Sequence, residues 1–320
     1  MTRDSHGPEP TTAAGDSRLP GGGRPSRYDF STRGVTFDSG GTACSGRLYL
    51  PDRPADPPVV VMAHGFGAEQ SFGLPRFAER FAEAGLAAFT FDYRGFGDSE
   101  GESRGLVSPG RQVADYRAAV DRVRRLPAVD GARPILWGTS LSGGHVLRVA
   151  AADARIRAVV AQVPMVDGRT FLRSRSPRYL LRATAAGIRD RLQSPLFGPH
   201  EVPVVGDPGD LAGIVEPGAR RAYLDLLPPE SDWENAMPAR SLLALPRYRP
   251  VADAGDVACP TLFLAGDRDD LVPVDRVAAA ADAAPNSTFV RLPIGHFDVY
   301  DGEGFESAVG HQLTFLRSVL

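Results

Sequence analysis

Short apolar runs alternate with amphipathic helical segments along most of this chain, and this alternation restricts the fold more than any other feature. The runs "PPVVVMAHG" (57–65), "LAAFTFDYRG" (86–95) and "IRAVVAQVP" (156–164) show no polar alternation, as expected of strands buried on both faces. Between them, residues 111–126 place apolar side chains at steps of three and four, which predicts an amphipathic helix. Strands joined by such helices run parallel, because the crossover returns the chain to the same edge of the sheet. The pattern therefore predicts an α/β protein with a mostly parallel sheet.

Residues 33–37 and 44–50 flank a "DSGG" turn and predict a hairpin ahead of the first buried strand. After this hairpin, the alternation of strands and helices is interrupted in one place. From 165 to 257 the pattern is irregular and rich in proline and arginine, and an unstructured loop of that length would be unusual in a compact domain. We therefore expect eight strands flanked by helices in a core formed by residues 28–164 and 258–320. A mainly helical cap, residues 165–257, should be inserted between strands six and seven.

Composition excludes several classes of protein. Residues 1–27 are rich in proline, glycine, serine and charge and lack the apolar segment of a secretory signal, so we expect a disordered leader. No apolar run approaches the roughly 20 residues that span a bilayer, which predicts a soluble, cytoplasmic protein. The net charge of −3 gives no electrostatic reason to expect nucleic acid or an anionic membrane as a partner. Cys44 and Cys259 fit no metal spacing and are expected to be free thiols.

A serine stands where one predicted strand meets the following helix, in "ILWGTSLSGGHV" (135–146). Ligands of α/β sheets bind beyond the carboxyl ends of the strands, near helix N-termini, so this turn projects its side chain into the binding crevice. The residues at 138 and 142–144 are small, as a strained turn requires. Ser140 also lies where backbone N–H groups and the helix dipole stabilise a developing negative charge. These features indicate a nucleophile elbow, although an ordinary Gly/Ser-rich loop has a similar composition.

A serine nucleophile needs a base, and the base needs an orienting carboxylate. Asp267, Asp269 and Asp270 follow the predicted strand "TLFLAG", and His296 follows "FVRLPIG". An oxyanion also needs a second N–H donor, usually from the loop after the third strand, where the sequence reads "MAHGFG" (62–67). Because all these groups come at strand ends in one order, we expect them to meet in one site. Spacing alone leaves the choice among the three aspartates open.

Five segments resemble the serine hydrolases of the α/β-hydrolase fold: "HGFG", "DYRGFGDSEG" (92–101), "GTSLSGG", "GDRDDLVP" (266–273) and "GHFDVY". The resemblance covers about residues 28–320 and is strongest to the prokaryotic branch near dienelactone hydrolases, prolyl-oligopeptidase catalytic domains and bacterial acyl esterases. It implies that Ser140 is the nucleophile, His296 the general base and Asp269 the carboxylate that orients it. The N–H groups of Leu141 and Phe66 would form the oxyanion hole.

One residue departs from the family pattern Gly-x-Ser-x-Gly, because Ser142 replaces the last glycine. Ser142, Tyr93, Phe171 and Trp233 are the candidate substrate-binding residues. The arginines between 169 and 191 indicate either a solvated face or a seat for a substrate carboxylate or a coenzyme A phosphate.

The resemblance implies hydrolysis of a small-molecule carboxylic ester through an acyl-enzyme, with no metal and no organic cofactor. A thioesterase, an acyltransferase or an acyl-eliminating lyase would use the same groups and stays an alternative. A non-catalytic binding member of the fold is a second alternative, because fold does not dictate function. The partner we expect is a small-molecule ester or thioester. The oligomeric state is left open, with a dimer as one option.

Overall fold

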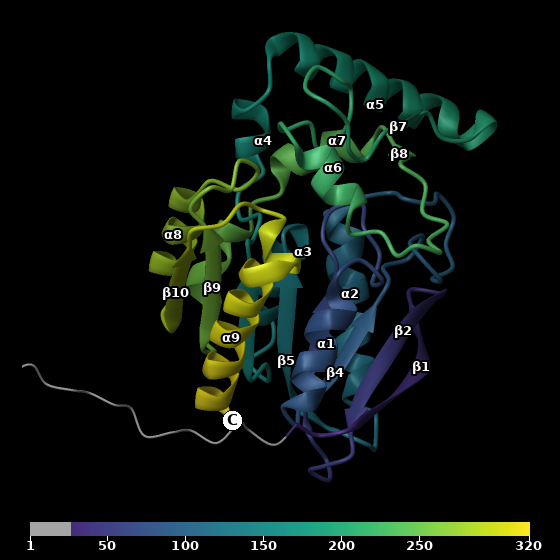
Figure 1. The fold of residues 1–320 in the computed structure, drawn as a ribbon. Coiled ribbons are helices and arrows are strands. Elements are labelled where there is room, and N and C mark those ends of the chain that lie inside the picture. Colours follow the sequence, from purple (N-terminus) through teal and green to yellow (C-terminus); the bar gives the residue numbers. More distant parts are fainter. Residues whose placement is uncertain (1–26) are drawn as a thin grey trace, which may run out of the picture.

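Eight strands form one sheet in the order β1-β2-β4-β3-β5-β6-β9-β10 in the computed structural model, which describes residues 27–320 (Figure 1). The strands β1 (Phe30–Ser39) and β2 (Thr42–Pro51) form an antiparallel pair, and β2 also pairs antiparallel with β4 (Ala87–Phe91). All other neighbouring pairs in this sheet are parallel. In spatial order, β4 pairs with β3 (Pro58–Ala63), β3 with β5 (Asp130–Thr139), β5 with β6 (Ala158–Gln162), β6 with β9 (Thr261–Gly266), and β9 with β10 (Ser287–Leu292). The predicted hairpin and mostly parallel eight-stranded sheet are confirmed.

Helices cover both faces of this sheet. One face packs against α1 (Leu74–Glu83) and α9 (Gly302–Val319). The other packs against α2 (Pro109–Val123), α3 (Leu141–Ala151) and α8 (Val274–Ala283). Strand side chains alternate between the two faces, so both sides of a central strand must be apolar.

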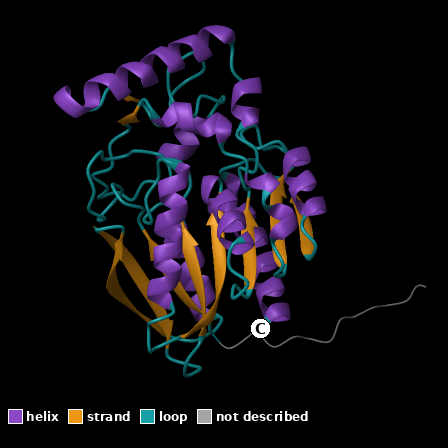
Figure 2. Ribbon diagram, turned by 180° about the vertical axis from the view of Figure 1, so that it is seen from behind, coloured by secondary structure: helices purple, strands orange, loops and turns teal. Residues whose placement is uncertain are grey.

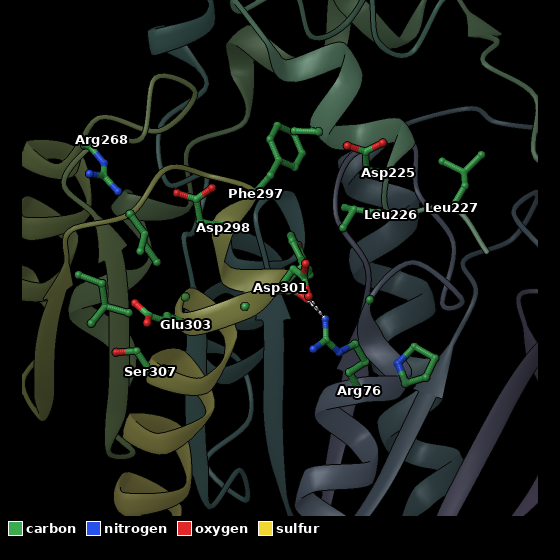
Figure 3. A pocket seen from close by; sticks show the side chains of 18 of the residues that line it. Arg76, Asp225, Leu226, Leu227, Arg268, Phe297, Asp298, Asp301, Glu303 and Ser307 are labelled. Carbon is green, nitrogen blue, oxygen red and sulfur yellow. Dashed lines mark hydrogen bonds and ion pairs between the residues drawn. The ribbon is translucent and has the colours of Figure 1, made fainter. Parts of the chain in front are cut away.

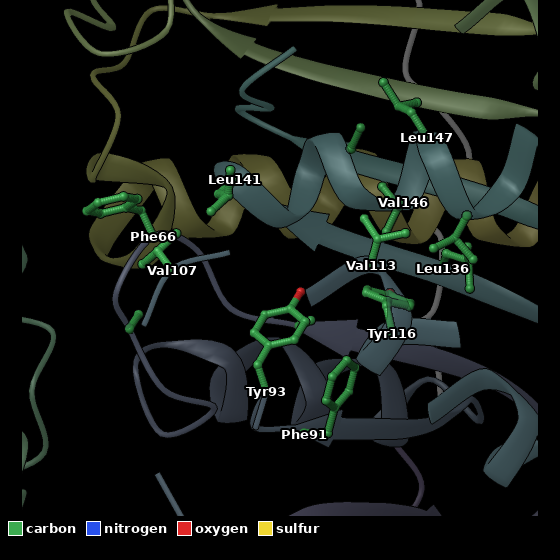
Figure 4. Packing of buried hydrophobic residues seen from close by; sticks show 14 of the residues in the cluster. Phe66, Phe91, Tyr93, Val107, Val113, Tyr116, Leu136, Leu141, Val146 and Leu147 are labelled. Atoms are coloured by element: carbon green, nitrogen blue, oxygen red, sulfur yellow. The ribbon is translucent and has the colours of Figure 1, made fainter. Parts of the chain in front are cut away.

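The apolar core continues up to the end of β5. Figure 4 shows the cluster on the α2 and α3 face, which includes Phe66 from the loop after β3 and Leu141 from the first turn of α3. Tyr116 of α2 lies deeper in this cluster and donates its hydroxyl to the carbonyl oxygens of Val61 and Trp137. The loops that follow β3 and β5 are therefore anchored on packed side chains.

The segment between β6 and β9 leaves the sheet and lies over the carboxyl ends of the parallel strands (Figures 1 and 2). It contains short 3₁₀ turns and the elements α4 (Arg169–Arg173), α5 (Pro177–Phe197), β7 (Glu201–Val202), α6 (Ala219–Leu224), β8 (Met237–Pro238) and α7 (Ser241–Ala244). It therefore occupies the place predicted for the cap, between the sixth and seventh strands of the sheet. The limits of core and cap at residues 165 and 257 stay a prediction.

The predicted leader lies outside the described residues, apart from its last residue. Cys44 is buried, Cys259 is half-buried, and both are free thiols. Within residues 27–320, no helix is both long and apolar enough to cross a bilayer.

Candidate active site

Ser140 lies between β5 and α3 in a strained backbone conformation. Its φ is 54° and its ψ is −118°, a combination that non-glycine residues rarely adopt. The Ser140 N–H donates to the carbonyl oxygen of Gln162 at 2.9 Å, and the N–H of Met165 donates to the carbonyl oxygen of Ser140 at 2.8 Å. The end of β6 and the chain that follows it therefore hold the serine in this turn.

Neighbouring backbone approaches the turn too closely for larger residues. A Cβ atom at Gly138 would lie 2.2 Å from the carbonyl oxygen of Ser142, and one at Gly65 would lie 3.1 Å from the Cβ of Ser140. The first distance is prohibitive and the second is tight. The small residues seen in the sequence around Ser140 are thus a packing requirement of the turn.

Asp269 and His296 reach Ser140 from the ends of two further strands. The Nε2 atom of His296 is 3.0 Å from the Ser140 Oγ, and its Nδ1 atom is 2.7 Å from the Asp269 Oδ2. Asp269 is 8% exposed and His296 is 5% exposed, whereas Ser140 is half-buried. The three side chains form one hydrogen-bonded chain that ends at an accessible hydroxyl.

The geometry distinguishes Asp269 from the other carboxylates nearby. Its Oδ1 accepts two backbone N–H groups of the following loop, at 2.9 and 2.8 Å, and these bonds fix the carboxylate that faces His296. Asp267 instead pairs with Arg291 at 2.7 Å near the surface. Asp298 accepts a backbone N–H at 2.7 Å and caps a turn.

The two N–H groups predicted to form the oxyanion hole come from adjacent loops. Leu141 is the first residue of α3, so its N–H has no acceptor within the helix. The loop of Phe66 is held by the inserted segment: the Tyr223 hydroxyl donates to the carbonyl oxygen of Phe66 at 2.9 Å, and the Trp233 Nε1 donates to that of Gly67 at 2.9 Å. Trp233, a candidate substrate contact, therefore fixes the loop. The sequence carried no signal for this hydrogen bond of Tyr223, because its acceptor is distant backbone.

Ser142 and Tyr93 lie in the core beneath the turn. The Ser142 Oγ donates to the carbonyl oxygen of His64 at 2.7 Å and accepts the Tyr93 hydroxyl, and both side chains are fully buried. Neither lines the cavity at Ser140. Their contact with substrate stays a prediction, and this placement favours support of the turn instead.

A cavity of about 70 Å³ opens at Ser140. Phe171 is the candidate substrate contact that lines it. Polar groups in the wall include Arg175 and Glu216, which pair at 2.6 Å and are mostly buried. The remaining wall is largely apolar and includes Phe66, Leu141, Met165, Ile214, Leu245, Leu271 and Val272.

A larger hollow of about 990 Å³ lies beside α1 and α9 (Figure 3). It is rimmed by charged side chains, among them Arg76, which donates to Asp301 at 2.8 Å. Phe297, next to His296 in sequence, is part of its wall, but Ser140 is not. The Ser140 hydroxyl therefore faces the smaller cavity.

Two further histidines near the turn are buried in the core. Burial lowers the pKa of His64 to about 4 and the pKa of His145 to about 3. The Nδ1 atom of His64 lies 3.1 Å from the carbonyl oxygen of Gly65, and the Nδ1 atom of His145 lies 2.5 Å from the Tyr248 hydroxyl. Both are neutral at physiological pH and serve the packing of the core.

We expect acid to destabilise the protein through these histidines. The unfolded chain takes up a proton on each near the usual pKa of about 6.5, whereas the folded chain does so only near pH 4 or 3. The unfolded state therefore binds more protons over this interval, and stability falls as the pH drops below about 6.5. His145→Gln should reduce the slope of the free energy of unfolding against pH by up to about 1.4 kcal/mol per pH unit. Urea unfolding at a series of pH values measures the slope, and an unchanged slope would contradict the assignment.

Asp92 acts in the opposite direction, because burial raises its pKa to about 6. Its folded form retains a proton that the unfolded chain releases near pH 3.8, so its contribution grows as the pH falls through 6. This contribution is present in both proteins. It cancels when the slope of unfolding free energy against pH for the His145→Gln variant is subtracted from the same slope for the native chain.

Comparison with known proteins identifies relatives that match most of the chain. The model of the family described as serine aminopeptidase, S33, matches residues 56–195. The quorum-quenching protein AidA of Acinetobacter baumannii is 38% identical over 287 residues, which are 89% of this chain and 94% of that protein. The thiohydrolase aneE of Aspergillus aculeatus is 29% identical over 297 residues, which are 88% of this chain and 91% of that protein.

Solved structures agree with the sequence matches. The structure of DcsB in complex with its substrate analogue superposes with a TM-score of 0.77 at 26% identity, over 90% of this chain and 99% of that one. The chain belongs to the α/β-hydrolase superfamily.

Proposed function

We propose that this protein hydrolyses a carboxylic ester of a small molecule through an acyl-enzyme on Ser140. The hydrogen-bonded chain from the Ser140 Oγ through His296 to Asp269 carries this proposal. A serine hydroxyl is a weak nucleophile until a base removes its proton, and the imidazole is placed to do so. The carboxylate keeps the ring in the tautomer whose Nε2 can accept that proton.

The reaction would proceed in two halves. His296 Nε2 takes the hydroxyl proton as the Ser140 Oγ attacks the ester carbonyl carbon, and the oxyanion accepts hydrogen bonds from the N–H groups of Leu141 and Phe66. The tetrahedral intermediate then expels the alcohol, which leaves with the proton from His296. In the second half His296 activates a water molecule, which attacks the acyl carbon and releases the acid and Ser140.

Hydrolysis of a thioester is the second candidate. It is favoured by the relative named thiohydrolase, which matches over 88% of this chain. The same side chains would act, with a thiol as the leaving group. Acyl transfer would need an acceptor other than water in the second half. Matched p-nitrophenyl esters and acyl thioesters separate the candidates, and the class with the higher kcat/KM at equal acyl length is the substrate class.

Labelling by a fluorophosphonate probe tests the proposal as a whole. Such probes phosphonylate only an activated serine, so we expect one label per chain, at Ser140, in intact and peptide mass spectra. A non-catalytic binding member of the fold would take no label. Lack of label together with lack of turnover on both ester and thioester panels would overturn the proposal.

Phe171 should limit the length of the acyl chain. It lines the cavity at Ser140, so Phe171→Ala should raise kcat/KM for longer acyl esters relative to shorter ones, by about tenfold for each added methylene that the enlarged cavity accepts. Steady-state kinetics on a series of p-nitrophenyl esters measures this ratio.

Phe197→Ala is the matched control, because Phe197 is 81% exposed and lies outside the cavity wall. Phe197→Ala should keep the native ratio of kcat/KM between longer and shorter acyl esters. If both variants keep the native ratio, Phe171 does not bound the acyl site.

A further inference from the structure

The outer face of the insertion carries a band of exposed apolar side chains. We define this apolar band as Leu172 of α4 together with Leu181, Ile188, Leu192, Leu196 and Phe197 of α5, whose exposed fractions run from 40% to 81%. In both views α5 lies at the end of the molecule opposite the C-terminus (Figures 1 and 2). Large apolar side chains that are exposed on one part of a soluble protein mark interaction surfaces.

The band is not needed for the packing of α5 itself. Leu181, Ile188 and Leu192 follow at steps of seven and four and so share one side of the helix. A different side of α5 is buried through Tyr179, Ala183 and other residues that contact the rest of the insertion. The helix is therefore held in place while the band faces outward.

Exposed arginines accompany the band on α4 and α5. Residues 169–197 contain seven arginines and a single acid, Asp190, which is buried and pairs with Arg240 at 2.9 Å. Arg175 pairs with Glu216. The other six are exposed, and no carboxylate of residues 27–320 forms an ion pair with them: Arg169, Arg173, Arg178, Arg182, Arg189 and Arg191. This local excess of positive charge is concealed by the net charge of −3 for the whole chain.

We propose that this face docks on an anionic lipid surface. An amphipathic helix in the plane of a membrane buries its apolar side near the acyl chains, while arginines on its flanks reach the head groups. The band and the six exposed arginines supply these two elements on one helix and its neighbour. The inference does not depend on the proposed hydrolysis.

The shape and the charge of this face argue against two other partners. No band residue lines the cavity at Ser140 or the larger hollow beside α1 and α9, so neither hollow would let the band receive a helix of another protein. Two copies of α5 packed against each other would bring the arginine flanks of both copies together, which is repulsive. A lipid surface requires no groove and attracts the arginines.

Vesicle co-sedimentation of the full chain tests the proposal. We expect binding to vesicles that contain phosphatidylglycerol, little binding to phosphatidylcholine alone, and weaker binding as salt is raised. Leu192→Ser combined with Leu196→Ser should lower the partition coefficient by about tenfold or more. Arg189→Gln and Arg191→Gln should each lower it about fivefold.

Leu320→Ser and Arg317→Gln are matched controls, because both residues are exposed and lie outside the band. They should bind vesicles as the native chain does, and the melting temperature of each variant reports whether it is folded. Absence of binding to anionic vesicles at low salt would overturn the proposal, as would equal losses in the controls. If the leucine variants instead dissociate a dimer in analytical ultracentrifugation and leave vesicle binding unchanged, the band is an interface between copies and the proposal is wrong.

Discussion

Ser140→Ala should abolish labelling by a fluorophosphonate probe and lower kcat on the best ester by a factor on the order of 10⁶. The expected loss is large because the variant has no atom that can form the acyl-enzyme, whereas the base and the oxyanion donors remain. The hydroxyl accounts for little of the packing, since Ser140 is half-buried and its backbone is held by bonds to Gln162 and Met165. Initial rates and the intact mass after probe treatment measure the two effects.

Ser142→Ala is the matched control for this variant. It removes a hydroxyl two residues away and leaves the buried hydroxyl of Tyr93 without its acceptor. We expect a loss of about 1–3 kcal/mol in the free energy of unfolding, with labelling retained and kcat changed far less than in Ser140→Ala. If labelling disappears in Ser142→Ala and persists in Ser140→Ala, the nucleophile has been assigned to the wrong serine.

The core of the fold could be predicted because its pattern is local. Strands such as β6 are apolar on both faces, so an uninterrupted run like "AVVAQ" identifies them without knowledge of their neighbours. The carboxyl ends of parallel strands share one edge, so motifs after β3, β5, β9 and β10 must come close together. Chain order alone therefore brought Ser140, Asp269 and His296 to one edge of the sheet.

The contacts of the insertion could not be predicted in this way. Trp233 donates to the carbonyl oxygen of Gly67, 166 residues away, and backbone acceptors leave no mark in a sequence. An indole in an irregular segment therefore suggested a pocket wall, while its N–H in fact holds the loop of Phe66. For Ser142 and Tyr93, the motif located the residues but could not show that their hydroxyls bond to each other inside the core.

Net charge averages over the chain and therefore says little about any one part of its surface. A value of −3 gave no reason to expect an anionic surface as a partner. The arginines of α4 and α5 lie on two successive helices, while most of the acids that balance them lie elsewhere in the chain. A count over residues 169–197 alone, with seven arginines and one acid, shows a local excess of positive charge that the total does not.

Asp269→Asn should leave the fold intact and lower kcat by about 10⁴. The Asn side chain keeps an oxygen that can accept the two loop N–H groups now bonded to Oδ1, so the loop after β9 stays in place. Its NH₂ group then faces the Nδ1 atom of His296, which must accept a hydrogen bond instead of donating one. The ring proton moves to Nε2, and the atom that should take the proton of Ser140 can no longer accept it. Steady-state kinetics and thermal unfolding measure activity and fold separately.

Asp267→Asn is the matched control, since it makes the same change two residues away in a carboxylate that pairs with Arg291 near the surface. Exposed ion pairs contribute little, so kcat and the melting temperature should stay close to native. A retained fluorophosphonate label in Asp269→Asn, formed more slowly than in the native chain, would show that the serine is present but poorly activated. If Asp269→Asn were nearly as active as the native protein while Asp267→Asn lost activity, the hydrogen bond at 2.7 Å between Asp269 and His296 would have no catalytic role.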